Sequence, residues 1–144
     1  YIYNSTIASN YSGGRGGGIY TTGTVDIKNS IFGYNDAGVL EPEISGTVTA
    51  IYSYFTALYT GSGGSFDGDT DGTGNLIGAD PVFVAPDPAT SAHPKTGGDY
   101  HLQAYAPGID TAKSTGLGVP DFDIEGYPRD VAGDKVDMGA YEYH

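Results

Sequence analysis

The residues best suited to chemistry lie in the stretch FDGDTDGTGN at 66–75. Asp67, Asp69 and Asp71 alternate with glycine and threonine, and Asn75 follows after a short spacing. Carboxylates at positions i, i+2 and i+4 can wrap a hard cation, because alternate oxygens converge when a glycine-rich loop curls. The sequence therefore predicts a calcium site formed by Asp67, Asp69, Asp71 and Asn75, with Asp80 as a ligand from outside the loop.

This loop matches only part of the EF-hand pattern. The first six positions, counted from Asp67, fit the D-x-[DN]-x-[DN]-G template, but the twelfth position is Gly78. A bidentate glutamate normally closes the site at that twelfth position. The sequence thus excludes a complete EF-hand, and a solvated polar loop without calcium remains the alternative.

A second acidic cluster lies in PDFDIEG at 120–126. Here the more economical interpretation is a polar turn in which Asp123 or Glu125 pairs with Arg129, because solvated charge pairs are common on protein surfaces. Asp80, Asp110 and Asp137 each precede a tight or constrained step of the chain. Aspartates in such places favour turn and cap roles over catalysis.

Catalytic constellations are not evident. A polysaccharide lyase needs a basic residue beside carboxylates or calcium, whereas Lys28 and Arg15 have no such neighbours in the sequence. A glycosidase needs two facing carboxylates, and the sequence cannot pair Asp26 with Asp36. The histidines follow no metal-binding spacing: His93, His101 and His144. We therefore assign no catalytic residue.

Composition narrows the class of protein and its partners. The formal net charge of -12 would repel phosphate backbones, so nucleic acid is excluded as a partner. No apolar run approaches the roughly 20 residues that a membrane-spanning helix needs. With 24 glycines and 13 tyrosines among 144 residues, the composition favours short strands joined by tight turns. The fold class predicted is all-β.

Strand-like phrases recur along the first part of the chain. GTVDIKNSIF at 23–32 returns as GTVTAIYSYF at 46–55, with the same residue at five of ten positions. A looser copy, NSTIASN at 4–10, matches NSIFGYN at 29–35. Repeats of this length without helical periodicity indicate a β-solenoid, in which each copy forms one coil. Ile7, Phe32 and Phe55 would then form one inward ladder, and Asn29 with Ser30 would close a corner.

These repeats resemble those of bacterial surface proteins with the pectate-lyase-like fold. The resemblance covers about residues 1–60 and implies a right-handed parallel β-helix. It says little about activity, because lyases and adhesins share such phrases.

The second half resembles the C-terminal region of secreted bacterial proteins of the choice-of-anchor type. Four phrases occur in the family's order: GNLIGADPVFV at 74–84, DYHLQAYAPGIDTA at 99–112, PDFDIEGYPRD at 120–130 and VDMGAYEYH at 136–144. Ala106 stands where the family usually has serine, and no sorting anchor follows His144. We expect this half to cap the solenoid, with residues 76–84 and 136–143 on or beside the final coils.

Together these observations predict one domain. Residues 1–65 would form the parallel β-helix coils (a β-solenoid), and residues 66–144 an irregular β-rich C-terminal capping region. The expected function is a non-catalytic structural or adhesive module, extracellular or on the cell surface of a bacterium. Its partners would be further copies stacked end to end as an oligomer or fibre, and a carbohydrate or surface protein ligand. The alternative is a carbohydrate-active enzyme, a polysaccharide lyase or glycosidase, or the tail of one.

Overall fold

The computed structural model describes residues 1–39, 43–56, 74–78, 80–87, 89–90 and 97–144. None of these residues is helical, so the described part of the chain holds no helix long and apolar enough to cross a membrane. The strands, in chain order, are β1 (Ile2–Tyr3), β2 (Thr6–Ala8), β3 (Tyr11–Ser12), β4 (Ile19–Lys28), β5 (Ile31–Gly33), β6 (Asp36–Ala37), β7 (Ile44–Ile51), β8 (Tyr54–Phe55), β9 (Leu76–Ile77), β10 (Phe83–Ala85) and β11 (Asp99–Leu102).

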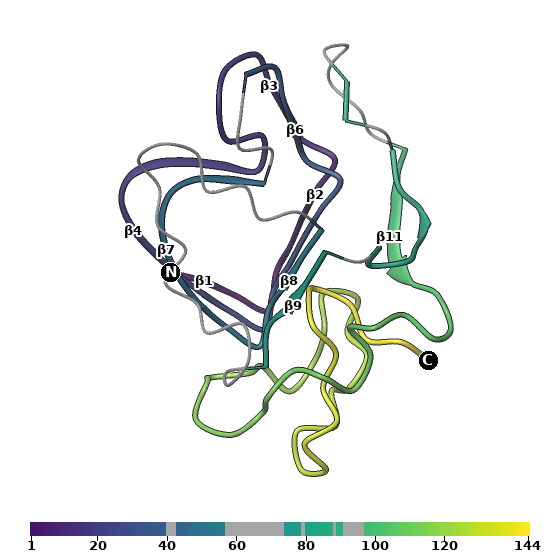
Figure 1. Ribbon diagram of the computed structural model, residues 1–144. Helices are drawn as coiled ribbons and strands as arrows, with labels where there is room; N and C mark the ends of the chain where they lie inside the picture. Colours follow the sequence, from purple (N-terminus) through teal and green to yellow (C-terminus); the bar gives the residue numbers. More distant parts are fainter. Residues whose placement is uncertain (40–42, 57–73, 79, 88, 91–96) are drawn as a thin grey trace.

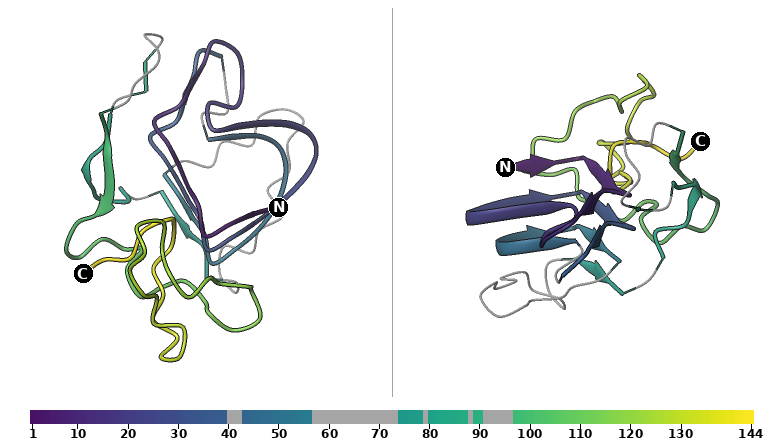
Figure 2. Two further views of the ribbon diagram at one scale, coloured as in Figure 1. Left: turned by 180° about the vertical axis from the view of Figure 1, so that it is seen from behind. Right: turned by 90° about the horizontal axis from the view of Figure 1, so that it is seen from above.

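Three parallel sheets are stacked from successive passes of the chain. Their strand orders are β1-β4-β7, β2-β5-β8-β9 and β3-β6. The chain returns to each sheet one strand further along, so that its described residues wind as coils: coil 1 (residues 2–26), coil 2 (27–39 and 43–49) and coil 3 (50–56 and 74–77). Figure 1 looks along the stack, and the right-hand view of Figure 2 shows the coils one above another. The all-β class and the stacked parallel arrangement are thus confirmed.

The register of the sheets follows the sequence repeats. Val25 lies opposite Val48, and Phe32 lies opposite both Ile7 and Phe55. Between Tyr20 and Thr24 the register shifts, because residues 21–23 face Gly46 alone. Gly46 has a φ of 137°, and a Cβ there would lie 2.5 Å from the carbonyl oxygen of Thr21. Only glycine fits at this position. The register shift here accommodates the change in repeat length between coils.

The interior of the coils is apolar. The predicted ladder of Ile7, Phe32 and Phe55 is confirmed, and the rings of Phe32 and Phe55 stack with centroids 5.4 Å apart. Stacked aromatic pairs add stabilisation beyond the area they bury. The buried residues of this inner core are Ile27, Phe32, Val48, Ala50 and Phe55.

A ladder of serines closes one corner of the coils. The amide of Ser5 donates to Oγ of Ser30, and the amide of Ser30 donates to Oγ of Ser53, both at 3.2 Å. Asn75 continues the ladder, since its Oδ1 accepts the amide of Ser53 at 2.9 Å. The corner role predicted for Ser30 is confirmed, and it recurs at the same place in every coil.

The residue before each serine takes a left-handed backbone conformation. Asn4, Asn29 and Tyr52 have φ values of 47°, 49° and 49°. Asparagine tolerates this conformation better than most residues, which explains its place in the first two coils. The side chain of Asn29 also accepts the amide of Lys113 at 3.1 Å and donates to its carbonyl at 2.8 Å. A corner of coil 2 thereby holds the C-terminal part of the chain.

The described residues of the second half, 80–87, 89–90 and 97–144, which we call the flank region, lie along the side of the stack (Figures 1 and 2). They pack against the outward side chains of the β2-β5-β8-β9 sheet in a second core: Ile31, Tyr54, Phe83, Leu102, Ala106, Ala112, Val136 and Met138. Within this region β10 and β11 pair in antiparallel fashion. The flank region therefore buries the outer face of one sheet.

This position differs from the cap expected over the final coils. β9 does form the last rung of its sheet, as expected for residues 76–77. The amide of Gly139, however, donates to the carbonyl of Asn29 in coil 2, and the amide of Ala140 donates to Oγ1 of Thr6 in coil 1. Residues 139–140 thus lie beside the first two coils. The sequence repeats relate the coils to one another only. They do not predict which coil a segment without repeats contacts.

Candidate functional site

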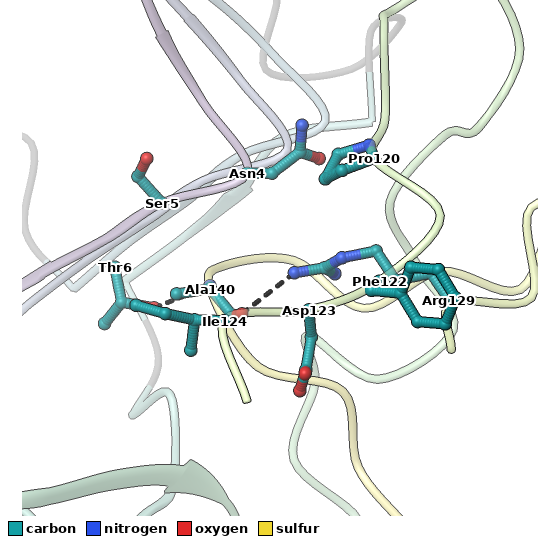
Figure 3. Close-up of a pocket in the computed structure, with 9 residues that line it drawn as sticks. All are labelled: Asn4, Ser5, Thr6, Pro120, Phe122, Asp123, Ile124, Arg129 and Ala140. Atoms are coloured by element: carbon teal, nitrogen blue, oxygen red, sulfur yellow. Dashed lines mark hydrogen bonds between the residues drawn. The ribbon is translucent and has the colours of Figure 1, made fainter. Parts of the chain in front are cut away.

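Two adjoining pockets lie between coil 1 and the flank region, and together we call them the edge groove. The larger has a volume of about 390 Å³ (Figure 3) and is lined by Asn4, Ser5, Thr6, Pro120, Phe122, Asp123, Ile124, Arg129 and Ala140. The smaller has a volume of about 150 Å³ and is lined by Thr6, Ala8, Tyr100, Ile124, Ala140 and Tyr141. Volumes of this size lie near the lower range of ligand sites.

One wall of the edge groove is the outer edge of β2. This strand is the end strand of its sheet. The carbonyl of Ser5 accepts the amide of Ile31 at 2.9 Å, and the amide of Ser9 donates to the carbonyl of Gly33 at 3.1 Å. Because backbone groups alternate along a strand, the amides and carbonyls of the strand's two ends, Thr6 and Ala8, face away from β5. Nδ2 of Asn10 donates to the carbonyl of Ala8 at 3.1 Å, but no neighbouring strand covers this row of backbone groups in the described part of the chain.

The opposite wall is apolar and belongs to the flank region. Phe122 and Ile124 leave 57% and 70% of their surface exposed. Pro120 lies beside them, and Figure 3 shows these side chains facing Asn4 and Thr6 across the pocket. Exposed apolar side chains grouped at one groove mark a surface suited to binding.

Asp123 holds this wall in shape. Its carboxylate accepts the amides of Glu125 at 2.9 Å, Tyr127 at 2.8 Å and Glu142 at 3.0 Å. Burial disfavours the charged form, but the three amide donors and the nearby Arg129 outweigh it and lower the pKa of Asp123. The predicted turn is confirmed, since the amide of Gly126 donates to the carbonyl of Asp123 at 3.2 Å. The predicted pairing of Asp123 with Arg129 is wrong, because the carboxylate binds backbone amides and Arg129 pairs with Glu142.

Arg129 forms the floor of the larger pocket (Figure 3). Its Nη1 donates to Oε1 of Glu142 at 2.5 Å, and Nη2 donates to the carbonyls of Gly139 at 3.1 Å and Ala140 at 3.0 Å. The side chain is 1% exposed. Its Nε is buried and has no hydrogen-bond partner in the described part of the chain. A buried donor left without an acceptor is costly, and the other bonds of the guanidinium offset this cost.

Glu125, which the sequence offered as a partner for Arg129, binds a histidine instead. Its Oε2 lies 2.8 Å from Nε2 of His101, and Oδ1 of Asp99 lies 2.6 Å from Nδ1 of the same ring. The hydrogen bonds from Glu125 and then Asp99 raise the pKa of His101. Carboxylates occupy both ring nitrogens, so neither nitrogen is free to take a proton from a substrate. This arrangement favours a structural role for His101.

The predicted calcium ligands can be compared with the structure only in part. Asn75 uses both ends of its amide in the corner of coil 3: Oδ1 accepts the amide of Ser53, and Nδ2 donates to the carbonyl of Ala50 at 2.7 Å. Three further ligands fall outside the described residues: Asp67, Asp69 and Asp71.

Asp80, the predicted outside ligand, holds a turn. Its Oδ1 accepts the hydroxyl of Tyr34 and the amide of Val82, the latter at 2.7 Å. Burial and then this carboxylate raise the pKa of Tyr34. Among the described residues no group of three or more histidines and carboxylates is arranged to hold a metal ion. Calcium binding by the 67–71 loop stays a prediction.

Glu43 is a buried acid that the sequence did not single out. It lies at the start of β7, where Nδ2 of Asn35 donates to its Oε2 at 2.5 Å and the hydroxyl of Thr56 donates to Oε1. Burial raises its pKa to about 7, although both hydrogen bonds act in the opposite direction. A single acid before a strand gives no sequence signal for burial, because one partner, Asn35, lies across the same coil and the other, Thr56, lies in the next coil.

No family model, curated protein or solved structure matches this chain. The resemblances to pectate-lyase-like and choice-of-anchor proteins therefore rest on the sequence phrases alone.

Proposed function

We propose that this chain is a non-catalytic structural or adhesive module of a secreted or cell-surface bacterial protein. In this proposal its coils form a right-handed parallel β-helix, and the ends of the stack assemble with further copies into an oligomer or fibre. The proposed β-helix goes one step beyond the stacked parallel sheets of the structure. The proposed location is based on the sequence resemblances.

The observation that carries the proposal is how the buried charged side chains are used. Asp137 accepts the amides of Asp110 at 2.8 Å and Tyr143 at 2.6 Å, and Glu142 accepts Arg129 and the amide of Asp137. These groups hold the flank region together by bonds to the backbone and to each other. A rigid scaffold needs such internal cross-links, whereas catalysis needs groups that remain free to contact a substrate.

Assembly is supported by the free edge of coil 1. Among the described strands, β1, β2 and β3 each pair with a neighbour on one side only. Unpaired strand edges are templates for adding another strand, and natural proteins usually block them with charges or proline. The outer positions of β2 carry Thr6 and Ala8, which leave that edge accessible.

Sedimentation velocity over a range of concentrations, with calcium and with chelator, tests the proposal. We expect concentration-dependent association that Ala8→Pro abolishes, because proline removes an amide that faces outward and blocks strand addition. Ala8→Ser keeps that amide and is the matched control. Association that requires calcium would support the ion site at residues 67–71. A monomer at every concentration, indifferent to calcium, would contradict the assembling role.

A further inference from the structure

The edge groove has the geometry of a missing rung in the β2-β5-β8-β9 sheet. Successive strands of a sheet lie about 4.8 Å apart and are joined by backbone hydrogen bonds. The backbone amides and carbonyls on the outer side of β5 bond to β2 in this way. The equivalent amides and carbonyls of β2, those of Thr6 and Ala8, face the groove. The backbone of coil 1 is therefore prepared for one more parallel strand.

The serine ladder leaves an acceptor at the same edge. Ser30 donates its hydroxyl to the carbonyl of Lys28 at 2.8 Å and accepts the amide of Ser5 from the coil before it. Ser5 likewise donates its hydroxyl to the carbonyl of Tyr3 at 2.8 Å. In the described part of the chain no amide donates to Oγ of Ser5. By the repeat, this oxygen lies where it would accept the amide of an incoming strand.

The flank region supplies the side-chain contact for that strand. In the existing coils the outward residues at this position, Ile31 and Tyr54, pack against the flank region, as does Leu76. The exposed side chains of Ile124 and its neighbours lie beyond Thr6, beside the outward position of the next rung. Figure 2 shows the light-green part of the flank region reaching past the first coil. An apolar side chain in the next rung would fill this space.

From these three features we infer that the edge groove binds an extended polypeptide strand that runs parallel to β2. The strand has the pattern of this chain's own coils, with a small polar residue at the corner and an apolar residue facing Ile124. Another strand matches the regular spacing of backbone donors and acceptors along a sheet edge. The inference deepens the assembly in the proposed function, and rests on it only for the source of the strand.

A synthetic peptide with the sequence NSIFGYN, copied from residues 29–35, tests the inference with the full chain. The matched control peptide is N-methylated at its Phe and Tyr, whose amides would bond to the carbonyls of Thr6 and Ala8. We expect fluorescence anisotropy to show saturable binding of the first peptide and at least about tenfold weaker binding of the second. Amide shifts in a ¹⁵N spectrum should centre on residues 4–8 and 121–124.

Variants locate the site. Ile124→Ser should weaken binding of the first peptide by at least about fivefold, while Tyr105→Ser, at a residue that is 98% exposed and outside the groove, should leave it unchanged. Absence of binding up to about 1 mM peptide, or equal binding of both peptides, would overturn the inference. So would binding of cellohexaose, a neutral oligosaccharide, in the groove in place of the peptide.

The two proposals fail separately. Peptide binding by a chain that sediments as a monomer would support the strand site and contradict self-assembly. Association that Ile124→Ser leaves unchanged, in a chain that does not bind the peptide, would support self-assembly and overturn the strand site.

Discussion

The coils and the flank region are stabilised by different kinds of bonds. In the coils, short polar side chains make the same bond one coil after another, as Ser30 and Ser53 do when each accepts the amide of the preceding serine at 3.2 Å. In the flank region, buried charged groups make bonds that occur once, such as the ion pair of Arg129 with Glu142 at 2.5 Å. Repetition distributes stability over many small contributions, whereas the flank region concentrates it in a few side chains.

This difference predicts that single substitutions damage the two regions unequally. A coil residue shares its role with equivalents above and below it, and each bond contributes about 1 kcal/mol. A buried charge has no equivalent, and removing its partner leaves it unpaired in a medium of low polarity. The following variants test this comparison.

Arg129→Met should have the largest effect. It leaves the carboxylate of Glu142 buried without its partner and removes donors to the carbonyls of Gly139 and Ala140. We expect the free energy of unfolding to fall by about 3–5 kcal/mol, measured by urea denaturation. Lys135→Met removes an exposed cation from the same region and is the control. A loss below about 1 kcal/mol for Arg129→Met would refute the concentrated stability of the flank region.

Glu43→Gln should stabilise the protein at high pH. The carboxyl pKa is raised from 4.5 to about 7 by burial, so the folded state keeps its proton where the unfolded state has lost it. Stability that is fully present below pH 4.5 is therefore lost as the pH rises to about 7, by roughly 3 kcal/mol in total. Glutamine removes this loss.

The measurement for Glu43 is thermal unfolding at pH 4 and pH 8. The variant should match the wild type at the lower pH and exceed it at the higher pH. Asp121→Asn, which removes an exposed carboxylate, should show no such dependence. Equal pH profiles for wild type and Glu43→Gln would mean that Glu43 is not the buried acid described above.

Ser30→Ala and Ser5→Ala form a matched pair within the coils. Ser30 accepts one amide and donates to one carbonyl, so its loss should cost about 1–3 kcal/mol in chemical denaturation. Ser5 only donates, to the carbonyl of Tyr3, and its loss should cost less than about 1 kcal/mol. Equal costs would contradict the free acceptor at the edge of coil 1.

Tyr54→Phe should have the smallest effect. The hydroxyl of Tyr54 is buried and has no hydrogen-bond partner among the described residues, and burial raises its pKa to about 12. Removing it should change the free energy of unfolding by less than about 0.5 kcal/mol, or stabilise the protein. Tyr34→Phe loses the bond to Asp80 and should cost about 1 kcal/mol in the same assay. A larger cost for Tyr54→Phe would reveal a partner for its hydroxyl.

Sequence reasoning predicted the coils better than the flank region, for a physical reason. Each coil must place an inward residue over its neighbour, so Ile7, Phe32 and Phe55 could be aligned from their spacing alone. The partner of Arg129 could not be found in this way. Glu142 is 13 residues away with no repeat to relate them, and nearer carboxylates offered an easier but incorrect pairing.

The edge groove was also beyond sequence reasoning. Thr6 and Ile124 are far apart in the chain and meet only because residues 139–140 lie beside coil 1. Stacked coils predict an unpaired strand edge at the end of the stack, but they do not predict which residues of the flank region lie beside that edge. Non-local contacts of this kind leave no local pattern in the sequence.

Hydrogen exchange of backbone amides in a dilute sample tests the central claim most directly. The amide of Ser9 bonds to the carbonyl of Gly33 and should exchange slowly, whereas the adjacent amide of Ala8 faces the groove and should exchange fast. Adding the NSIFGYN peptide should slow exchange at Ala8. Slow exchange at Ala8 in the isolated chain, or fast exchange at Ser9, would contradict an open-edged stack of coils.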